Sequence, residues 1–107
     1  MTKLNILIYV LSFLLLLADW AQTRQIAKNP DKWFETNKLL GVHPSVSRVD
    51  TYFAVVLAGY TVVYLALVKY VPPTAFLCGA IVAAIEAYVV YNNNKLGIPF
   101  FDDQHPD

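Results

Sequence analysis

The sequence is poor in charged residues and nearly free of cysteine. Only 15% of its 107 residues are charged, whereas an ordinary soluble domain has about a quarter. Eight basic and eight acidic residues cancel, and without a basic excess no nucleic-acid partner is expected. The single cysteine, Cys78, excludes an intramolecular disulfide scaffold and a cysteine-based zinc site. We interpret Cys78 as a small packing residue and predict neither a metal site nor a cofactor.

Long apolar blocks dominate what is present. Hydrophobic residues make up 57% of the chain and gather in blocks from Leu4 to Ala18, from about Val49 to Tyr70 and from about Pro73 to Tyr91. About 20 helical residues cross a hydrocarbon core of about 30 Å. Strands are disfavoured, because an open sheet edge in lipid would leave backbone groups unpaired. We therefore predict an all-α fold, a polytopic membrane protein with three transmembrane helices in a single domain.

The expected spans are about 4–27, 48–70 and 73–94, with a polar loop at 28–47, a Pro-Pro turn and a C-terminal tail at 95–107. The alternative for the first block is a cleaved signal peptide. Cleavage needs small residues after the block, and Asp19 and Trp20 stand there instead. A retained anchor is therefore favoured.

Basic residues predict an orientation. Three spans put the N-terminus and the Pro-Pro turn on one side, with Lys3 and Lys69, and put the loop and the tail on the other. Positive charge favours the cytoplasmic side. Loop 28–47 and the C-terminus are therefore expected in the cytoplasm. The second side holds the larger basic set, which is Arg24, Lys28, Lys32, Lys38, Arg48 and Lys95.

The polar loop predicts a short helix in the membrane interface. Asn29 or Asp31 could cap this helix, and Gly41 could end it. Trp33 and Phe34 would give it an apolar side that lies among the lipid headgroups. The alternative is a small lid that covers polar groups at the helix ends.

Two carboxylates fall at membrane depth, where each costs about 2.5–3.5 kcal/mol on insertion scales. Asp19 lies in the last third of the first helix, and Glu86 is displaced toward the loop end of the third. We predict a polar cluster on the loop side and an almost purely apolar Pro-Pro side. The alternative is a structural role, in which the carboxyl groups only pair with neighbours. The predicted cluster is Asp19, Gln22, Thr23 and Glu86, with Arg24 and Arg48 as candidate counter-ions.

Small residues at helical spacing predict close helix packing. Gly79, Ala83 and Ala87 form such a ridge on the third helix, and Ala54 and Ala58 form another on the second. A metal site was also considered. The candidate ligands, His43, Glu35 and Asp50, match no metal-binding spacing.

Two short patterns resemble a family of small uncharacterised bacterial inner-membrane proteins. The first is Asp-x-x-Gln-Thr at Asp19, and the second is Glu-x-Asn-x-x-Leu-Gly at Glu35, after Trp33. The resemblance covers about residues 15–55 and departs from the family at Lys38, where a proline often follows the asparagine. It implies a bacterial inner-membrane location and no particular activity. The residues it indicates are Asp19, Gln22, Thr23, Glu35 and Asn37, and the loop motif also includes Trp33 and His43.

Three functions are compatible with these patterns. The first is an accessory or assembly protein that associates, through its small-residue ridges, with itself or with a larger membrane complex in the lipid bilayer. The second is a subunit of an oligomeric proton- or cation-coupled transporter or channel that uses Asp19 and Glu86. The third is a small membrane enzyme that acts on lipid, with Asp19 and Glu35 as acid and base. The first is favoured, and an enzyme is the less favoured class.

Overall fold

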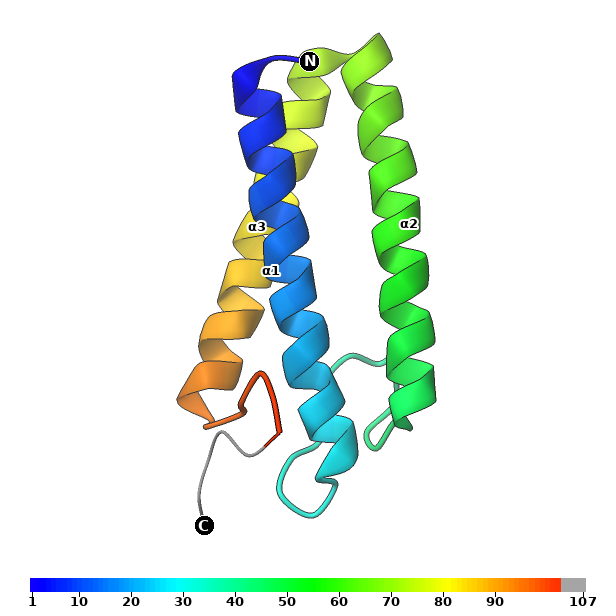
Figure 1. Cartoon of the computed structure of the whole chain (residues 1–107), viewed down its shortest axis with the longest axis vertical. Coiled ribbons are helices and arrows are strands. Elements are labelled where there is room, and N and C mark those ends of the chain that lie inside the picture. Colours follow the sequence, from blue (N-terminus) through cyan, green and yellow to red (C-terminus); the bar gives the residue numbers. More distant parts are fainter. Residues whose placement is uncertain (103–107) are drawn as a thin grey trace.

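The computed structural model describes residues 1–102, in which all the regular structure is α-helical. Helices α1 (Lys3–Lys28), α2 (Val46–Tyr70) and α3 (Pro72–Lys95) run along the long axis of the molecule (Figure 1). The predicted all-helical architecture is confirmed for this part of the chain. The predicted tail, 95–107, is described only in part, because residues 103–107 lie outside the described residues.

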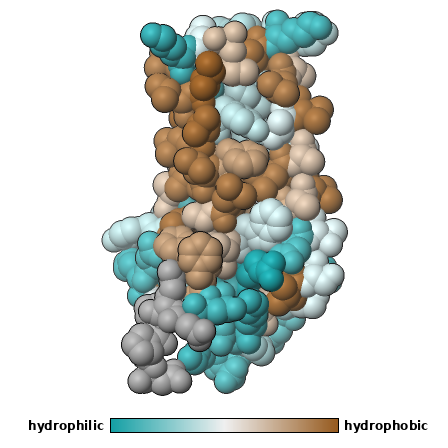
Figure 2. All heavy atoms as spheres, in the orientation of Figure 1, coloured by the Kyte–Doolittle hydropathy of each residue, from teal (hydrophilic) through white to brown (hydrophobic). Residues whose placement is uncertain are grey.

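Each helix is long and apolar enough to cross a membrane. The helices have 26, 25 and 24 residues, and a rise of about 1.5 Å per residue makes each longer than a hydrocarbon core of about 30 Å. Large apolar side chains lie on the outside, such as Leu7 with 64% and Val62 with 68% of their surface exposed. Figure 2 shows these residues covering most of the visible face, whereas polar residues gather at the loop end.

Local sequence sets the helix boundaries. The hydroxyl groups of Thr2 and Ser45 cap α1 and α2, and each accepts a hydrogen bond of 3.1 Å from the amide three residues later. Helix α3 begins at Pro72, where the missing N–H leaves no bond unmade. Only Val71 separates α2 from α3. These two helices are therefore antiparallel and held together at this end.

The loop between α1 and α2 consists of turns, so the predicted interfacial loop helix is wrong. The Asn29 carbonyl accepts amides from three and four residues later at 3.0 and 3.1 Å, which makes a single turn. The Glu35 and Asn37 side chains then accept backbone amide hydrogens that a helix would use. Finally, the Glu35 amide donates to the Val42 carbonyl at 2.9 Å. Hydrogen bonds between local side chains and the backbone therefore favour a closed loop over the predicted helix.

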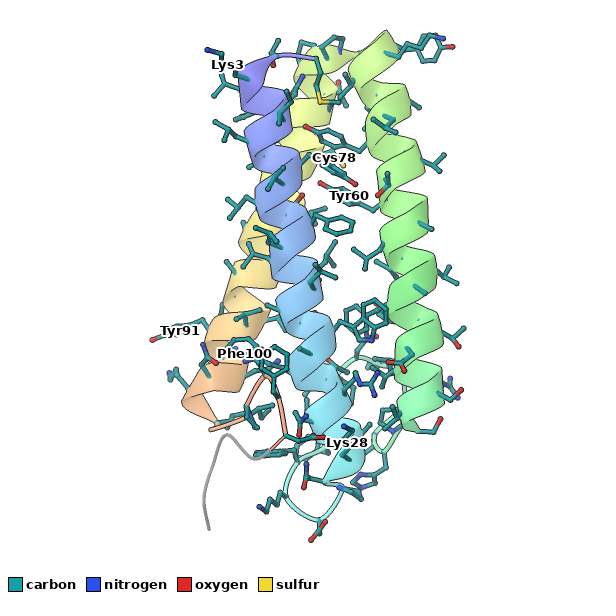
Figure 3. All side chains as sticks on the ribbon, viewed as in Figure 1. Lys3, Lys28, Tyr60, Cys78, Tyr91 and Phe100 are labelled. Carbon is teal, nitrogen blue, oxygen red and sulfur yellow. The ribbon has the colours of Figure 1, made fainter. Side chains whose placement is uncertain are left out.

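A network of hydroxyl groups occupies the Pro-Pro half of the bundle, so the expectation that this half is almost purely apolar is wrong. The hydroxyl oxygens of Tyr9 and Thr61 lie 2.7 Å apart, and those of Ser12 and Tyr60 lie 2.6 Å apart. Tyr64 donates a bond of 2.6 Å to a backbone carbonyl in the first turn of α1. Tyr60 projects between α1 and α2 (Figure 3). These interhelical bonds connect α1 to α2 in this half of the bundle.

Gly79 allows α3 to approach the other two helices closely. A Cβ atom at this position would lie 2.9 Å from the Ile8 side chain and 3.2 Å from the Tyr64 ring. Ala83, one turn further along, is also buried. Two residues of the predicted α3 ridge thus pack inside the chain itself. The other residues of the predicted ridges, Ala54, Ala58 and Ala87, are exposed on the outside of the bundle.

Residues 96–102, here called the C-terminal strap, fold back onto α1. Gly97 has a φ of +81°, a conformation that favours glycine and turns the chain after α3. Ile98 is then buried, with 3% of its surface exposed. The polar anchors are Gln22 to the Ile98 carbonyl at 3.4 Å, Gln25 to Asp102 at 2.7 Å and Lys28 to Asp102 at 3.0 Å.

Gly79→Leu is expected to destabilise the fold by about 1–3 kcal/mol, the usual cost of forcing extra carbon atoms into a packed interface. Gly59→Leu is the matched control, because nothing lies within 4 Å of a Cβ built at Gly59. Thermal unfolding in detergent, followed by circular dichroism, measures both variants. Equal melting temperatures for the two variants would contradict the packing assigned to Gly79.

Candidate functional site

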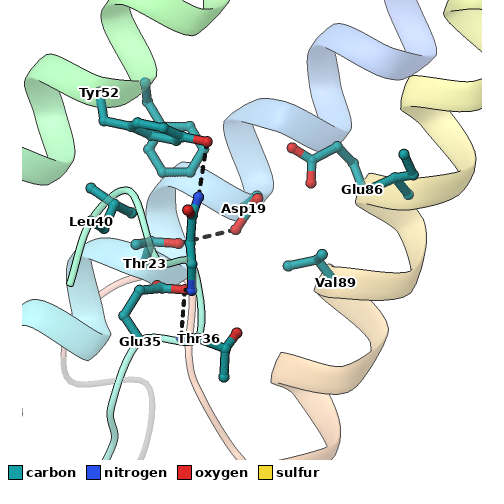
Figure 4. Close-up of a pocket in the computed structure, with 11 residues that line it drawn as sticks. Asp19, Thr23, Glu35, Thr36, Leu40, Tyr52, Glu86 and Val89 are labelled. Atoms are coloured by element: carbon teal, nitrogen blue, oxygen red, sulfur yellow. Dashed lines mark hydrogen bonds between the residues drawn. The ribbon is translucent and has the colours of Figure 1, made fainter. Parts of the chain in front are cut away.

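A cavity of about 320 Å³ lies at the loop end, enclosed by all three helices and the loop (Figure 4). Its polar wall carries three carboxyl groups together with hydroxyl and amide groups. Its apolar wall comes from α2, α3 and the loop. The polar lining is Asp19, Thr23, Glu35, Thr36, Asn37, Tyr52 and Glu86, and the apolar lining is Leu40, Phe53, Ile85 and Val89.

Asp19 on α1 and Glu86 on α3 face each other across the cavity (Figure 4) and are close enough for each carboxyl group to influence the other. They are buried, with 8% and 9% of their surface exposed. The Thr23 hydroxyl, one turn after Asp19, donates to the Asp19 carboxyl at 3.0 Å. Two carboxyl groups this close repel each other when both are charged, so a proton or a cation between them would relieve that repulsion.

Glu35 reaches the same cavity from the loop. One of its carboxyl oxygens accepts the backbone amides of Thr36 and Asn37, each at 2.9 Å. Burial raises the pKa of Glu35 above its ordinary value, and the nearby Asp19 charge raises it further, while the two backbone bonds lower it. The balance makes Glu35 easier to protonate than a glutamate in water.

The loop is fastened over the cavity as a lid. Asn37 donates to the Tyr52 hydroxyl at 2.9 Å and accepts the Leu39 amide at 3.0 Å. The Arg48 guanidinium donates to the Leu39 carbonyl at 3.0 Å. Leu40 is buried against α2 in an apolar cluster with Val49 and Phe53. The Asn37 carbonyl accepts the amides at positions 40 and 41, so the turn forms although Lys38 replaces the proline of the resembling family.

No basic residue lines this cavity among the described residues. Arg24, a candidate counter-ion, pairs with Asp50 at 2.9 Å. Arg48, the other candidate, donates to the loop backbone. Lys28 pairs with Asp102 in the C-terminal strap. The three carboxyl groups therefore line one cavity to which no basic side chain of residues 1–102 contributes.

The structure brings together most, but not all, of the residues that the sequence indicated. Asp19, Thr23, Glu35, Asn37 and Glu86 line the cavity. Three others lie elsewhere. Gln22 bonds to the α3 terminus, Trp33 lines a neighbouring cleft of about 240 Å³, and His43 is exposed.

Sequence reasoning indicated Glu35 and Asn37 on the loop but left Thr36 and Tyr52, which also line the cavity, out of the predicted site. Thr36 lies inside the Glu-x-Asn pattern, but nothing in the pattern marks its side chain. Tyr52 stands near the polar start of α2, and that position is the signal that could have indicated it. No sequence signal predicted the C-terminal strap, whose first amides donate to backbone carbonyls of the asparagine run at 92–94. Across residues 1–102, no group of three or more His, Cys, Asp or Glu side chains is placed to hold a metal ion.

Comparisons with protein-family models, curated proteins and solved structures found no match. The resemblance of the two short patterns to bacterial inner-membrane proteins stays a prediction. Function must therefore be argued from the cavity itself.

Asp19→Asn is expected to lower the pKa of Glu35, because the Asp19 charge helps to raise it. A raised carboxyl pKa favours the protonated form in the folded state, so the Glu35 contribution becomes less favourable as pH rises above its ordinary value of 4.5. Nuclear magnetic resonance titration of the Glu35 side-chain carbon in micelles measures this pKa. Asp31→Asn is the control, because Asp31 is an exposed loop carboxylate outside the cavity. An unchanged Glu35 titration in Asp19→Asn would show that the two groups do not interact.

Proposed function

We propose that this chain is an integral membrane protein that binds a proton or a small cation in the loop-side cavity through Asp19 and Glu86. The observation that carries the proposal is that three carboxyl groups line one cavity whose wall, as far as residues 1–102 form it, includes no basic residue. Carboxyl groups at this depth persist only when paired or when a bound positive charge compensates them. A proton or a cation supplies that charge.

The bilayer is the proposed surrounding of the three helices. Their length and their exposed apolar side chains support it. The excess of basic residues at the loop end supports a cytoplasmic loop 28–47 and C-terminus. The two sequence patterns support a bacterial inner membrane. The cavity would then open in the cytoplasmic half of the bilayer.

Exchange of a proton for a cation is the chemistry that the site suits best. The proton shared by Asp19 and Glu86 neutralises the pair when the cavity is empty of cations. A cation that enters brings its own charge, so the proton can leave without exposing two adjacent carboxylates to each other. Proton and cation therefore compete for one site, which is the requirement for coupled transport.

A single chain does not provide a polar path through the bundle. Leu16 is buried, with 4% of its surface exposed, between the hydroxyl network at Ser12 and the carboxyl group at Asp19. Transport would thus need a helix movement or an oligomer, and the exposed small residues of α2 offer a surface for the latter.

Addition of a cation to the purified protein in unbuffered detergent solution is expected to release about one proton per chain. Sodium, potassium and methylammonium chloride are the probes, and the pH change is the measurement. Glu86→Gln and Asp19→Asn should each reduce the release at least tenfold. Asp31→Asn should release as much as the wild type. Release by none of the salts, or undiminished release by Glu86→Gln, would refute the proposed site.

A second candidate function is the accessory or assembly role. Ala54 and Ala58 face outward on α2, and Gly59 beside them has open space around it. A small-residue surface of this kind lets a helix of another chain approach closely. The enzyme hypothesis has Asp19 and Glu35 in one cavity, but within residues 1–102 the cavity wall includes no Cys, Ser or His to act with them.

Ala58→Leu is expected to weaken self-association at least tenfold if α2 packs against a second copy, because the larger side chain keeps the backbones apart. Ala84→Leu is the matched control, since Ala84 is exposed on α3 outside the predicted ridges. Light scattering after size-exclusion chromatography in mild detergent gives the oligomeric state. A monomeric wild type, or equal effects of the two variants, would remove self-association as the basis of this role.

A further inference from the structure

The cavity has a mouth toward the outside of the bundle. Ile85 lines the cavity, yet 58% of its surface is exposed. The cavity therefore reaches the outer surface at α3. Helices α2 and α3 meet at Val71 and diverge toward the loop end (Figure 1). In the proposed bilayer, this mouth faces the acyl chains of the loop-side leaflet.

The polar wall has more hydrogen-bond acceptors than donors. The Thr23 hydroxyl and two backbone amides donate to Asp19 and Glu35. Glu86 points into the cavity (Figure 4), is nine-tenths buried, and faces the Asp19 carboxyl group. Its carboxyl oxygens can accept hydrogen bonds from a donor that enters the cavity. A primary ammonium group brings three N–H donors and one positive charge.

The apolar wall indicates that the ligand carries hydrocarbon next to its charge. Phe53 and Val89 line the cavity beside the carboxyl groups, and Ile85 continues this apolar surface to the mouth. A cavity of about 320 Å³ lies in the range of about 300–1,000 Å³ that holds small organic ligands. A bare metal ion suits it poorly, because across residues 1–102 no three acidic, His or Cys side chains converge closely enough.

We infer that the cavity binds an amphiphile with a primary amine, whose ammonium group lies beside Glu86 and Asp19. Its hydrocarbon chain leaves past Ile85 into the loop-side leaflet. This inference rests on the proposed function, since it names the cation that the carboxyl groups receive. It adds that the ligand enters sideways from the membrane and that three N–H donors, not charge alone, are recognised.

Native mass spectrometry of the protein in detergent tests the inference, because it counts bound molecules directly. Dodecylamine is expected to bind at one saturable site, at least tenfold more tightly than dodecyltrimethylammonium, which has the same chain but no N–H donor. It should also bind at least tenfold more tightly than ethylamine, which has the donors but no chain. Equal binding of dodecylamine and its trimethyl analogue would overturn the recognition of N–H donors.

Two variants test separately how the ligand's hydrocarbon chain and its ammonium charge are recognised. Ile85→Asn should weaken dodecylamine binding at least tenfold, because a polar amide replaces the apolar surface at the mouth. Ile81→Asn is the matched control, since Ile81 is exposed one turn away and does not line the cavity. Glu86→Gln should weaken the binding of every amine.

The outcomes distinguish the inference from the proposed function. Equal binding of ethylamine and dodecylamine, with no effect of Ile85→Asn, would refute the amphiphile and leave the cation site in place. Absence of amine binding together with undiminished proton release by Glu86→Gln would refute both. Preference for phosphatidylethanolamine over phosphatidylcholine would support the inference with a membrane lipid as the source of the amine. Dodecylamine binding without that preference would support it with a free amphiphilic amine.

Discussion

The contact between Asp19 and Glu86 determines how the loop end of the bundle is built. The two carboxyl groups lie on different helices, so their pairing requires α1 and α3 to stay together at this depth. An unpaired buried charge costs several kcal/mol, and the chain places no Lys or Arg beside the pair. Neutral donors serve instead, from the Thr23 hydroxyl on α1 and from the loop backbone that binds Glu35. The lid therefore satisfies polar groups without cancelling their charge.

The basic residues near the cavity are engaged in other tasks. Arg24 pairs with Asp50 and so joins α1 to the start of α2, and the Trp20 indole donates to the same carboxylate at 2.8 Å. Lys28 holds the C-terminal strap through Asp102, and hydrogen bonds from Gln25 and from Lys28 lower the pKa of that carboxyl group. Each ion pair stabilises the frame around the cavity. The loop end has several basic residues. Their side chains lie outside the described cavity wall because they are engaged in these other contacts.

Much of this architecture follows from the sequence by simple physics. The apolar blocks predicted the helices because lipid-facing surface must be apolar over a length of about 30 Å. The depth of Asp19 and Glu86 predicted their meeting, because each block has a defined length and direction. The loop conformation was out of reach, since the Asn37 side chain bonds Tyr52 on another helix. The sequence also could not show that Ala54 and Ala58 lie on the outer surface of the bundle. Small residues have the same spacing whether they pack against a helix of the same chain or face outward.

The two connections explain why the cavity lies on the loop side. A single residue, Val71, joins α2 to α3, so these helices must touch at that end, where Gly79 and the hydroxyl network fill the space. No connection holds α2 to α3 at the loop end, and these two helices diverge there (Figure 1), whereas the Arg24–Asp50 ion pair keeps α1 beside α2. A carboxyl pair at the tight end would have no volume for a ligand, and an open loop end lined only with apolar residues would close by packing. The unequal lengths of the two connections place the cavity at the loop end. Glu86 lies beyond the middle of α3, so its carboxyl group is at the same depth as this cavity.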